Sequence, residues 1–149
     1  MSAVQAPYGL RAVNELGGLP YAGSTRQFKI DSASANIYNG SVVAVGTNGL
    51  LTLVTTVGSD ASPFPAGVVG VFVGCTYVNA QGQVIFAQYF PTGTTGAVAY
   101  VVDDDRAVFQ VQANGSLGQT ALGANVVFSA AQTGSTSTGN STTAISTTL

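Results

Sequence analysis

The sequence contains little charge. Charged residues occupy 7% of its 149 positions, against roughly 25% in ordinary soluble domains. Gly, Ser, Thr, Asn and Gln take the place of the missing charges. A monomer generally keeps charges on its surface because they maintain solubility and oppose association. The shortage therefore favours a protein whose surface is covered by other protein in a stable assembly. A secreted β domain with a Ser- and Thr-rich surface is the alternative interpretation.

Basic residues are especially scarce. The chain has four of them, they do not cluster, and the net charge is −2. A nucleic-acid-binding surface needs a stripe of positive charge to neutralise phosphates, so we expect no nucleic-acid partner. We expect no membrane partner either. The longest nearly apolar run, residues 67–78, is too short to cross a bilayer as a helix and is expected to form a buried strand.

Histidine is absent, and cysteine occurs once, as Cys75. The lack of histidine excludes Ser–His and Cys–His pairs and imidazole bases. A single cysteine excludes an internal disulfide and a thiolate metal cluster. The sequence therefore predicts no enzyme, no cofactor and no metal site. It also indicates folding inside a cell, because no secretory signal is visible. Cys75 lies within the apolar run and is expected to be buried.

Asp103, Asp104 and Asp105 form the one cluster of carboxylates. Such a cluster could bind Ca²⁺, which takes six to eight oxygen ligands. Three consecutive side chains cannot all face one ion, however, and no other ligands are close in the sequence. We favour the alternative, in which the aspartates cap a turn between two strands and Arg106 offsets their mutual repulsion.

Alternating patterns and turn residues predict an all-β domain. Residues 26–30 alternate polar and apolar side chains, as a half-buried strand does. Asn48-Gly49 separates two apolar runs, which indicates a hairpin with a type I′ turn. Seven or eight short strands at this spacing predict a small barrel or sandwich. The expected strands are 26–30, 41–45, 50–57, 67–78, 83–90, 97–102, 107–113 and 125–130, with a loop at 59–65 and one helical turn at 117–122.

Two of these strands, 67–78 and 83–90, are expected to form a long hairpin. Its aromatic side chains are the obvious candidates to fill the core, because aromatic residues within strands are usually packed rather than exposed. We therefore expect the following to be buried: Phe72, Tyr77, Phe86 and Tyr89.

The two ends of the chain differ from its middle. Residues 1–24 are interrupted by Pro and Gly but carry spaced apolar anchors, which predicts an extended N-terminal arm that packs either on its own domain or on a neighbour. Residues 25–131 form the β domain. Residues 132–149 form a C-terminal tail in which 11 of 18 residues are Ser or Thr. That composition should not fold alone, but it can become ordered on a partner.

The order of motifs along nearly the whole chain resembles the small head-decoration (cement) proteins of tailed bacteriophages and cyanophages. The matching segments are Tyr8-Gly9-Leu10-Arg11, residues 18–28, Asn39-Gly40-Ser41-Val42-Val43, residues 67–75, Phe86-Ala87-Gln88-Tyr89-Phe90-Pro91, residues 99–104, Phe109-Gln110-Val111-Gln112-Ala113 and residues 134–141.

This resemblance implies a barrel or β-tulip-like domain that binds the outer surface of the capsid after synthesis in the host cytoplasm. It also implies a homodimer or homotrimer that stabilises joints between major capsid subunits. The arm supplies the candidate capsid contacts: Tyr8, Leu10, Arg11, Leu16 and Tyr21. Two alternatives remain open, a carbohydrate-binding or adhesive β module and a phage fibre or tail subunit.

Overall fold

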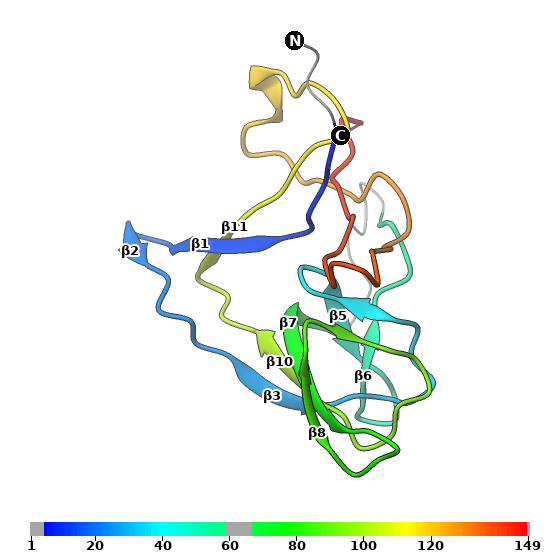
Figure 1. Cartoon of the computed structure of the whole chain (residues 1–149). Coiled ribbons are helices and arrows are strands. Elements are labelled where there is room, and N and C mark those ends of the chain that lie inside the picture. Colours follow the sequence, from blue (N-terminus) through cyan, green and yellow to red (C-terminus); the bar gives the residue numbers. More distant parts are fainter. Residues whose placement is uncertain (1–4, 59–66, 149) are drawn as a thin grey trace.

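A computed structural model describes residues 5–58 and 67–148 (Figure 1). The loop expected at 59–65 lies outside these residues. Within them, the chain forms three sheets and almost no helix, and none of the sheets closes into a barrel. The all-β prediction is therefore confirmed, in the form of a sandwich-like domain. The strands are β1 (Arg11–Glu15), β2 (Leu19–Pro20), β3 (Arg26–Lys29), β4 (Ile37–Tyr38), β5 (Val42–Val45), β6 (Leu51–Leu53), β7 (Val68–Val78), β8 (Val84–Ala87), β9 (Tyr89–Phe90), β10 (Val98–Val102) and β11 (Ala107–Gln110).

The largest sheet is built around β7. Its order is β3-β10-β7-β5-β6, and β8 pairs with β7 beyond the end of β5. The sequence of β7, VVGVFVGCTYV, is rich in β-branched and aromatic residues, which favour a pleated and partly buried strand. No helix of the described residues is long and apolar enough to pass through a membrane.

The hairpin between β5 and β6 forms as predicted, but its turn differs. Gly49 has φ +76°, and no described residue other than glycine has a positive φ, so Asn48 cannot occupy a type I′ turn. Instead, the Gly49 N–H donates to the Gly46 carbonyl at 3.0 Å, and the Gly46 N–H donates to the Leu50 carbonyl at 2.9 Å. This pattern belongs to the longer hairpin loop that ends in one left-handed glycine.

Two apolar clusters lie on opposite faces of the large sheet. Val43 belongs to the first cluster and Val42 to the second, and consecutive strand residues point to opposite faces. The first cluster is the main core and includes Phe72, Cys75 and Phe90. The second is formed where residues from outside the sheet cover its other face: Leu10, Phe109 and Phe128.

The N-terminal residues form a small sheet that stands to one side of the main body (Figure 1). In it, β1 pairs with both β2 and β11. Residues 11–15, within the predicted arm, therefore pair with a strand of the β domain of the same chain. The boundaries predicted at 24/25 and 131/132 stay predictions.

The C-terminal segment lies along the β domain, beside the start of the chain (Figure 1). Ser141 and Thr143 are buried within it. Gln132 is buried as well, and its side-chain amide bonds to both backbone groups of Val42 and to the Val54 carbonyl, at 2.7 to 2.9 Å. The polar tail is thus ordered on its own domain, because the Gln132 amide bonds to backbone groups of Val42 and Val54.

Three further expectations have different outcomes. Residues 125–130 form no strand and contribute only an isolated bridge between Phe128 and Ile145. A 3-10 turn at Gln119–Ala121 lies where one helical turn is expected. Phe86, expected in the core, is 76% exposed, which corrects that prediction. The register between β7 and β10 shifts near Val73. Each later residue of β7 therefore lies on the opposite face of the sheet from the one that strict alternation predicts.

Candidate functional site

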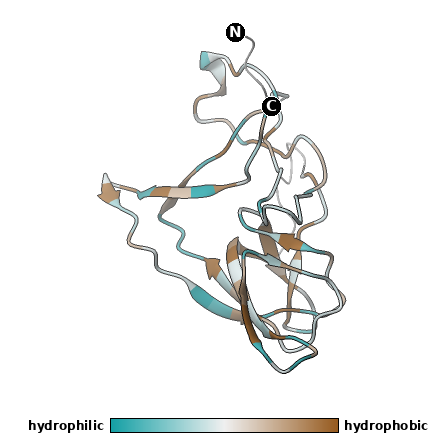
Figure 2. Cartoon of the chain, viewed as in Figure 1, coloured by the Kyte–Doolittle hydropathy of each residue, from teal (hydrophilic) through white to brown (hydrophobic). Residues whose placement is uncertain are grey.

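The small sheet β11-β1-β2 presents an apolar tip to solvent. Leu16 is 58% exposed, Leu19 is 51% exposed and Val13 is 42% exposed. Figure 2 shows this tip in brown at β2. The backbone of Leu16 is held in place, because its N–H donates to the Arg106 carbonyl at 2.8 Å and its carbonyl accepts from the Arg106 guanidinium at 3.3 Å. The apolar side chains are therefore displayed on an ordered support.

A groove of about 230 Å³ separates this small sheet from the outer face of the large one. Three of the five predicted contact residues line it, namely Leu10, Arg11 and Tyr21. The rest of its lining is mostly apolar: Ala12, Asn39, Val71, Val73, Val102 and Phe109. The groove is thus apolar with one cation at its wall.

That cation, Arg11, bonds to protein on both arms of its guanidinium. One nitrogen donates to the Asn39 side-chain oxygen, and Nη2 donates to Asn140 Oδ1 at 2.8 Å. Burial lowers the pKa of Arg11 from its usual value, although the group remains charged at neutral pH. Arg11 therefore links the N-terminal segment to the tail.

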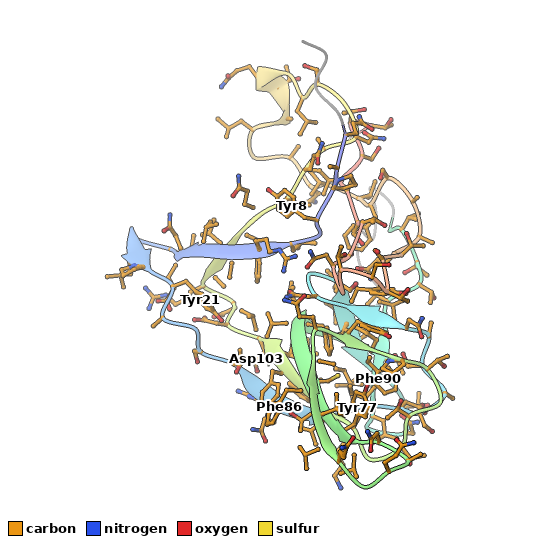
Figure 3. All side chains as sticks on the ribbon, in the orientation of Figure 1. Tyr8, Tyr21, Tyr77, Phe86, Phe90 and Asp103 are labelled. Carbon is orange, nitrogen blue, oxygen red and sulfur yellow. The ribbon has the colours of Figure 1, made fainter. Side chains whose placement is uncertain are left out.

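Tyr21 also lines the groove. Its hydroxyl donates to the Ser24 carbonyl at 2.8 Å. Burial raises the pKa of Tyr21, and the negative charges of Asp104, Glu15 and Asp103 raise it further. Figure 3 shows Tyr21 and Asp103 between the small sheet and the large one. The ring is thus fixed as a neutral, partly buried wall.

The backbone at Tyr8 and Gly9 crosses two other segments closely. A Cβ atom built on Gly9 would lie 2.7 Å from the Gly40 carbonyl oxygen and 2.8 Å from Ser141 Cβ. Leu10 N–H also donates to that Gly40 carbonyl, at 2.9 Å. We call this place, where residues 9, 40 and 141 meet, the three-segment crossing. It fixes the base of the small sheet.

The aspartate cluster forms a turn. Asp104 Oδ1 accepts from the Arg106 N–H at 2.9 Å, as a turn-capping aspartate does. Asp103 pairs with Arg26 at 2.9 Å. Arg106 itself turns to Leu16 instead of offsetting the aspartates, which differs from the expectation. No cluster of three or more His, Cys, Asp or Glu in the described residues is arranged to hold a metal ion.

The five candidate contacts thus fall in three places. Leu10, Arg11 and Tyr21 share the groove, Leu16 lies at the tip, and Tyr8 lies at the three-segment crossing. Their role as capsid contacts stays a prediction. Val13 and Leu19 belong to the apolar anchors expected along the arm but were not among the predicted contacts; the signal for Leu19 is the Gly17-Gly18 turn that it directly follows. Comparison with protein-family models, curated proteins and solved structures gives no match.

Proposed function

We propose that this chain is a virion structural protein that binds the outer surface of a phage capsid and stabilises the joints between major capsid subunits. Its role in this proposal is docking rather than catalysis. The observation that carries the proposal is the apolar tip of the small sheet, where Leu16, Leu19 and Val13 are exposed. Figure 1 shows β2, at this tip, away from the main body. The capsid itself is named by the resemblance of the motif order.

The composition supports a docking role. The chain as a whole carries few charges, so beyond Glu15 and Arg106, which lie beside Leu16, little charge has to lose its hydration when another protein covers the tip. Each large apolar side chain that becomes buried contributes about 1.5–3 kcal/mol. Because β1 and β2 are already paired, docking orders less backbone than it would for a flexible arm, and the entropic cost is smaller.

The resemblance supports a site at subunit joints. A decoration protein in this position has to adhere through modest contacts that are repeated many times over the shell. The neutral, polar exterior of this chain suits dense packing of copies, since copies with a large net charge would repel one another.

The test uses capsids of the phage that encodes the chain, prepared without this protein. Wild-type chain and the double variant Leu16→Ser, Leu19→Ser are incubated with the capsids, which are then sedimented to count the bound copies. Leu122→Ser is the matched control, because Leu122 is 82% exposed but lies outside the small sheet. The temperature at which DNA leaves the capsid is measured in parallel.

We expect the double variant to bind at least about tenfold more weakly, from the loss of two buried leucines, and to raise the DNA-release temperature less. The control should behave as the wild type does. The proposal is wrong if the wild-type chain does not sediment with capsids, or if electron microscopy of labelled protein finds it on fibres or tails instead.

A further inference from the structure

The free edge of β8 is the most exposed apolar feature of the large sheet. We infer that its partner is a second copy of this chain, and that the two copies join edge to edge across a two-fold axis to form one continuous sheet. This inference is independent of the capsid proposal, because it concerns the purified protein alone.

The pairing of the β7–β8 hairpin fixes the direction of the backbone groups on β8. The Asn79 N–H donates to the Gln83 carbonyl at 2.9 Å, which closes the β7–β8 hairpin with a hydrogen-bonded pair. Antiparallel pairs alternate between bonded and non-bonded. The pair Tyr77–Ile85 is therefore bonded, while Val78–Val84 and Thr76–Phe86 are not. The N–H and C=O groups of Val84 and Phe86 consequently point away from β7.

These outward groups have no partner among the described residues. Here β8 pairs only with β7, and no backbone hydrogen bond from Val84 or Phe86 to another segment occurs. Both residues are exposed, so water solvates the groups in the single chain. Such an edge is a ready template for another extended strand.

The β8 edge lacks the features that usually prevent another strand from pairing with an exposed edge. Proteins usually block an exposed edge with charged side chains, proline or a bulge. The opposite edge strand, β3, follows that rule, because Arg26 and Lys29 are exposed on it, and it is teal in Figure 2. Residues 83–88 contain no charge and no proline. The β3 edge of the sheet is therefore protected, whereas the β8 edge is open.

Exposed apolar side chains lie beside the open edge. Val84 is 60% exposed and Val78, its cross-strand neighbour, is 56% exposed. Phe86 lies on the same face, two residues from Val84, and is 76% exposed. Figure 3 shows Phe86 and the buried Phe90 on opposite sides of β7 and β8. An apolar row thus borders the unpaired backbone.

The β8 edge is complementary to the same edge of a second copy. If Ile85 lies on a two-fold axis opposite Ile85 of the second copy, Val84 faces Phe86 of that copy in both directions. These are the two residues whose backbone groups point outward, so the pair can form four hydrogen bonds. Their side chains also meet on one face, in aromatic–β-branched pairs. No like charges meet, because the strand has none.

This geometry also predicts a closed assembly of limited strength. Each copy offers one such edge, so pairing across the two-fold axis ends at two copies instead of growing into a filament. Three apolar side chains and a four-residue strand cover less than the roughly 800 Å² per partner of a standard interface. We therefore expect a dissociation constant of about 1 to 100 µM.

The test is sedimentation velocity of the full chain from about 1 to 500 µM, a range that spans the expected dissociation constant. The wild type should pass from monomer to dimer. Phe86→Lys should weaken dimerisation at least tenfold. So should Val84→Pro, because proline removes an outward N–H without breaking a bond to β7. Leu122→Lys is the matched control and should dimerise normally. Circular dichroism reports whether each variant is folded.

A cross-link tests the register. In a Cys75→Ala background, Ile85→Cys should form a disulfide-linked dimer on mild oxidation, because residue 85 faces itself across the axis. Val78→Cys is more exposed than Ile85→Cys but should not cross-link, because three strand spacings of about 4.8 Å separate the two copies of residue 78. A wild type that stays monomeric throughout, or dimers that survive both Phe86→Lys and Val84→Pro, would overturn the inference. Cross-linking at 78 but not at 85 would do the same.

Discussion

Arg11 Nη2 donates to Asn140 Oδ1 at 2.8 Å, a contact between residues 129 positions apart in the sequence. The other arm of the same guanidinium donates to Asn39. One side chain therefore connects the first strand, the loop before β5 and the C-terminal tail. A planar, forked group can do this because its donors are held in fixed directions.

Replacing Arg11 with lysine should release the tail. Lysine keeps the charge but cannot present two donors in a rigid fork, so we expect the free energy of unfolding to fall by about 1–2 kcal/mol. Amides of residues 133–146 should also exchange faster with deuterium. Arg106→Lys is the control, since Arg106 makes one exposed contact, at 3.3 Å to Leu16. Equal effects of the two substitutions would show that the fork has no special role.

Gly9→Ala should destabilise the chain strongly. Its φ of +76° is costly for alanine, and the added Cβ would overlap the Gly40 carbonyl and Ser141. Gly123→Ala separates the two effects, because Gly123 has φ +81° and nothing lies within 4 Å of its Cβ position. In urea titrations we expect a loss of about 1 kcal/mol for Gly123→Ala and about 3 kcal/mol or more for Gly9→Ala. Similar losses would mean that the crossing can relax.

Gln132→Glu should detach the tail at neutral pH. The amide nitrogen of Gln132 donates to the carbonyls of Val42 and Val54, and a carboxylate would place negative charge against both. The site is buried, so we expect a loss of about 3 kcal/mol or more. Gln110→Glu introduces the same charge at an exposed position and should cost little. The claim fails if thermal unfolding gives the two variants the same midpoint.

Cys75 should make the fold sensitive to alkaline pH. Burial raises the pKa of its thiol from the usual 9.0 to about 11. The folded chain then holds the proton at pH values where the unfolded chain has lost it, so stability falls as pH rises from about 9 to about 11. The fall is at most about 3 kcal/mol. Cys75→Ala should lose this part of the fall in stability at alkaline pH. Burial also raises the pKa values of Tyr21 and Tyr77, so a smaller fall should remain in that variant.

The same burial predicts slow thiol chemistry. Cys75 is 2% exposed, and its Sγ lies 3.4 Å from the Tyr89 carbonyl. A thiol reagent added to the folded chain should react only after denaturant is present, which an absorbance assay follows directly. Rapid labelling without denaturant would show that β7 and β9 separate readily.

Local patterns predicted much of this fold. The alternation at 26–30 and the turn residues at Asn48-Gly49 are short-range signals, and both correspond to observed elements. The all-β class followed from such signals. The type I′ turn did not form, because a hairpin loop can also place a single glycine in the left-handed region, and the dipeptide alone does not distinguish the two.

The long-range features could not be predicted in this way. Pairing of β1 with β11 joins residues about a hundred positions apart, and nothing in either segment names the other. The prediction that Phe86 is buried was wrong for two reasons. Residues 83–87 are apolar at four of five positions, so their pattern does not indicate which face of the strand points to the core. The bulge in β7 also leaves no signal in the sequence. The groove depends on the β1–β11 pairing and on the β7 bulge. The sequence could therefore indicate some of its lining residues but not its shape.

The three-segment crossing has a consequence for synthesis. Residues 9 and 40 leave the ribosome about a hundred residues before Asn140 and Ser141, which complete the contact. The N-terminal sheet therefore waits, partly assembled, while about a hundred further residues are made. The crossing cannot close until residues 140 and 141 have been made, so the apolar side chains that it helps to cover stay exposed on the growing chain until then.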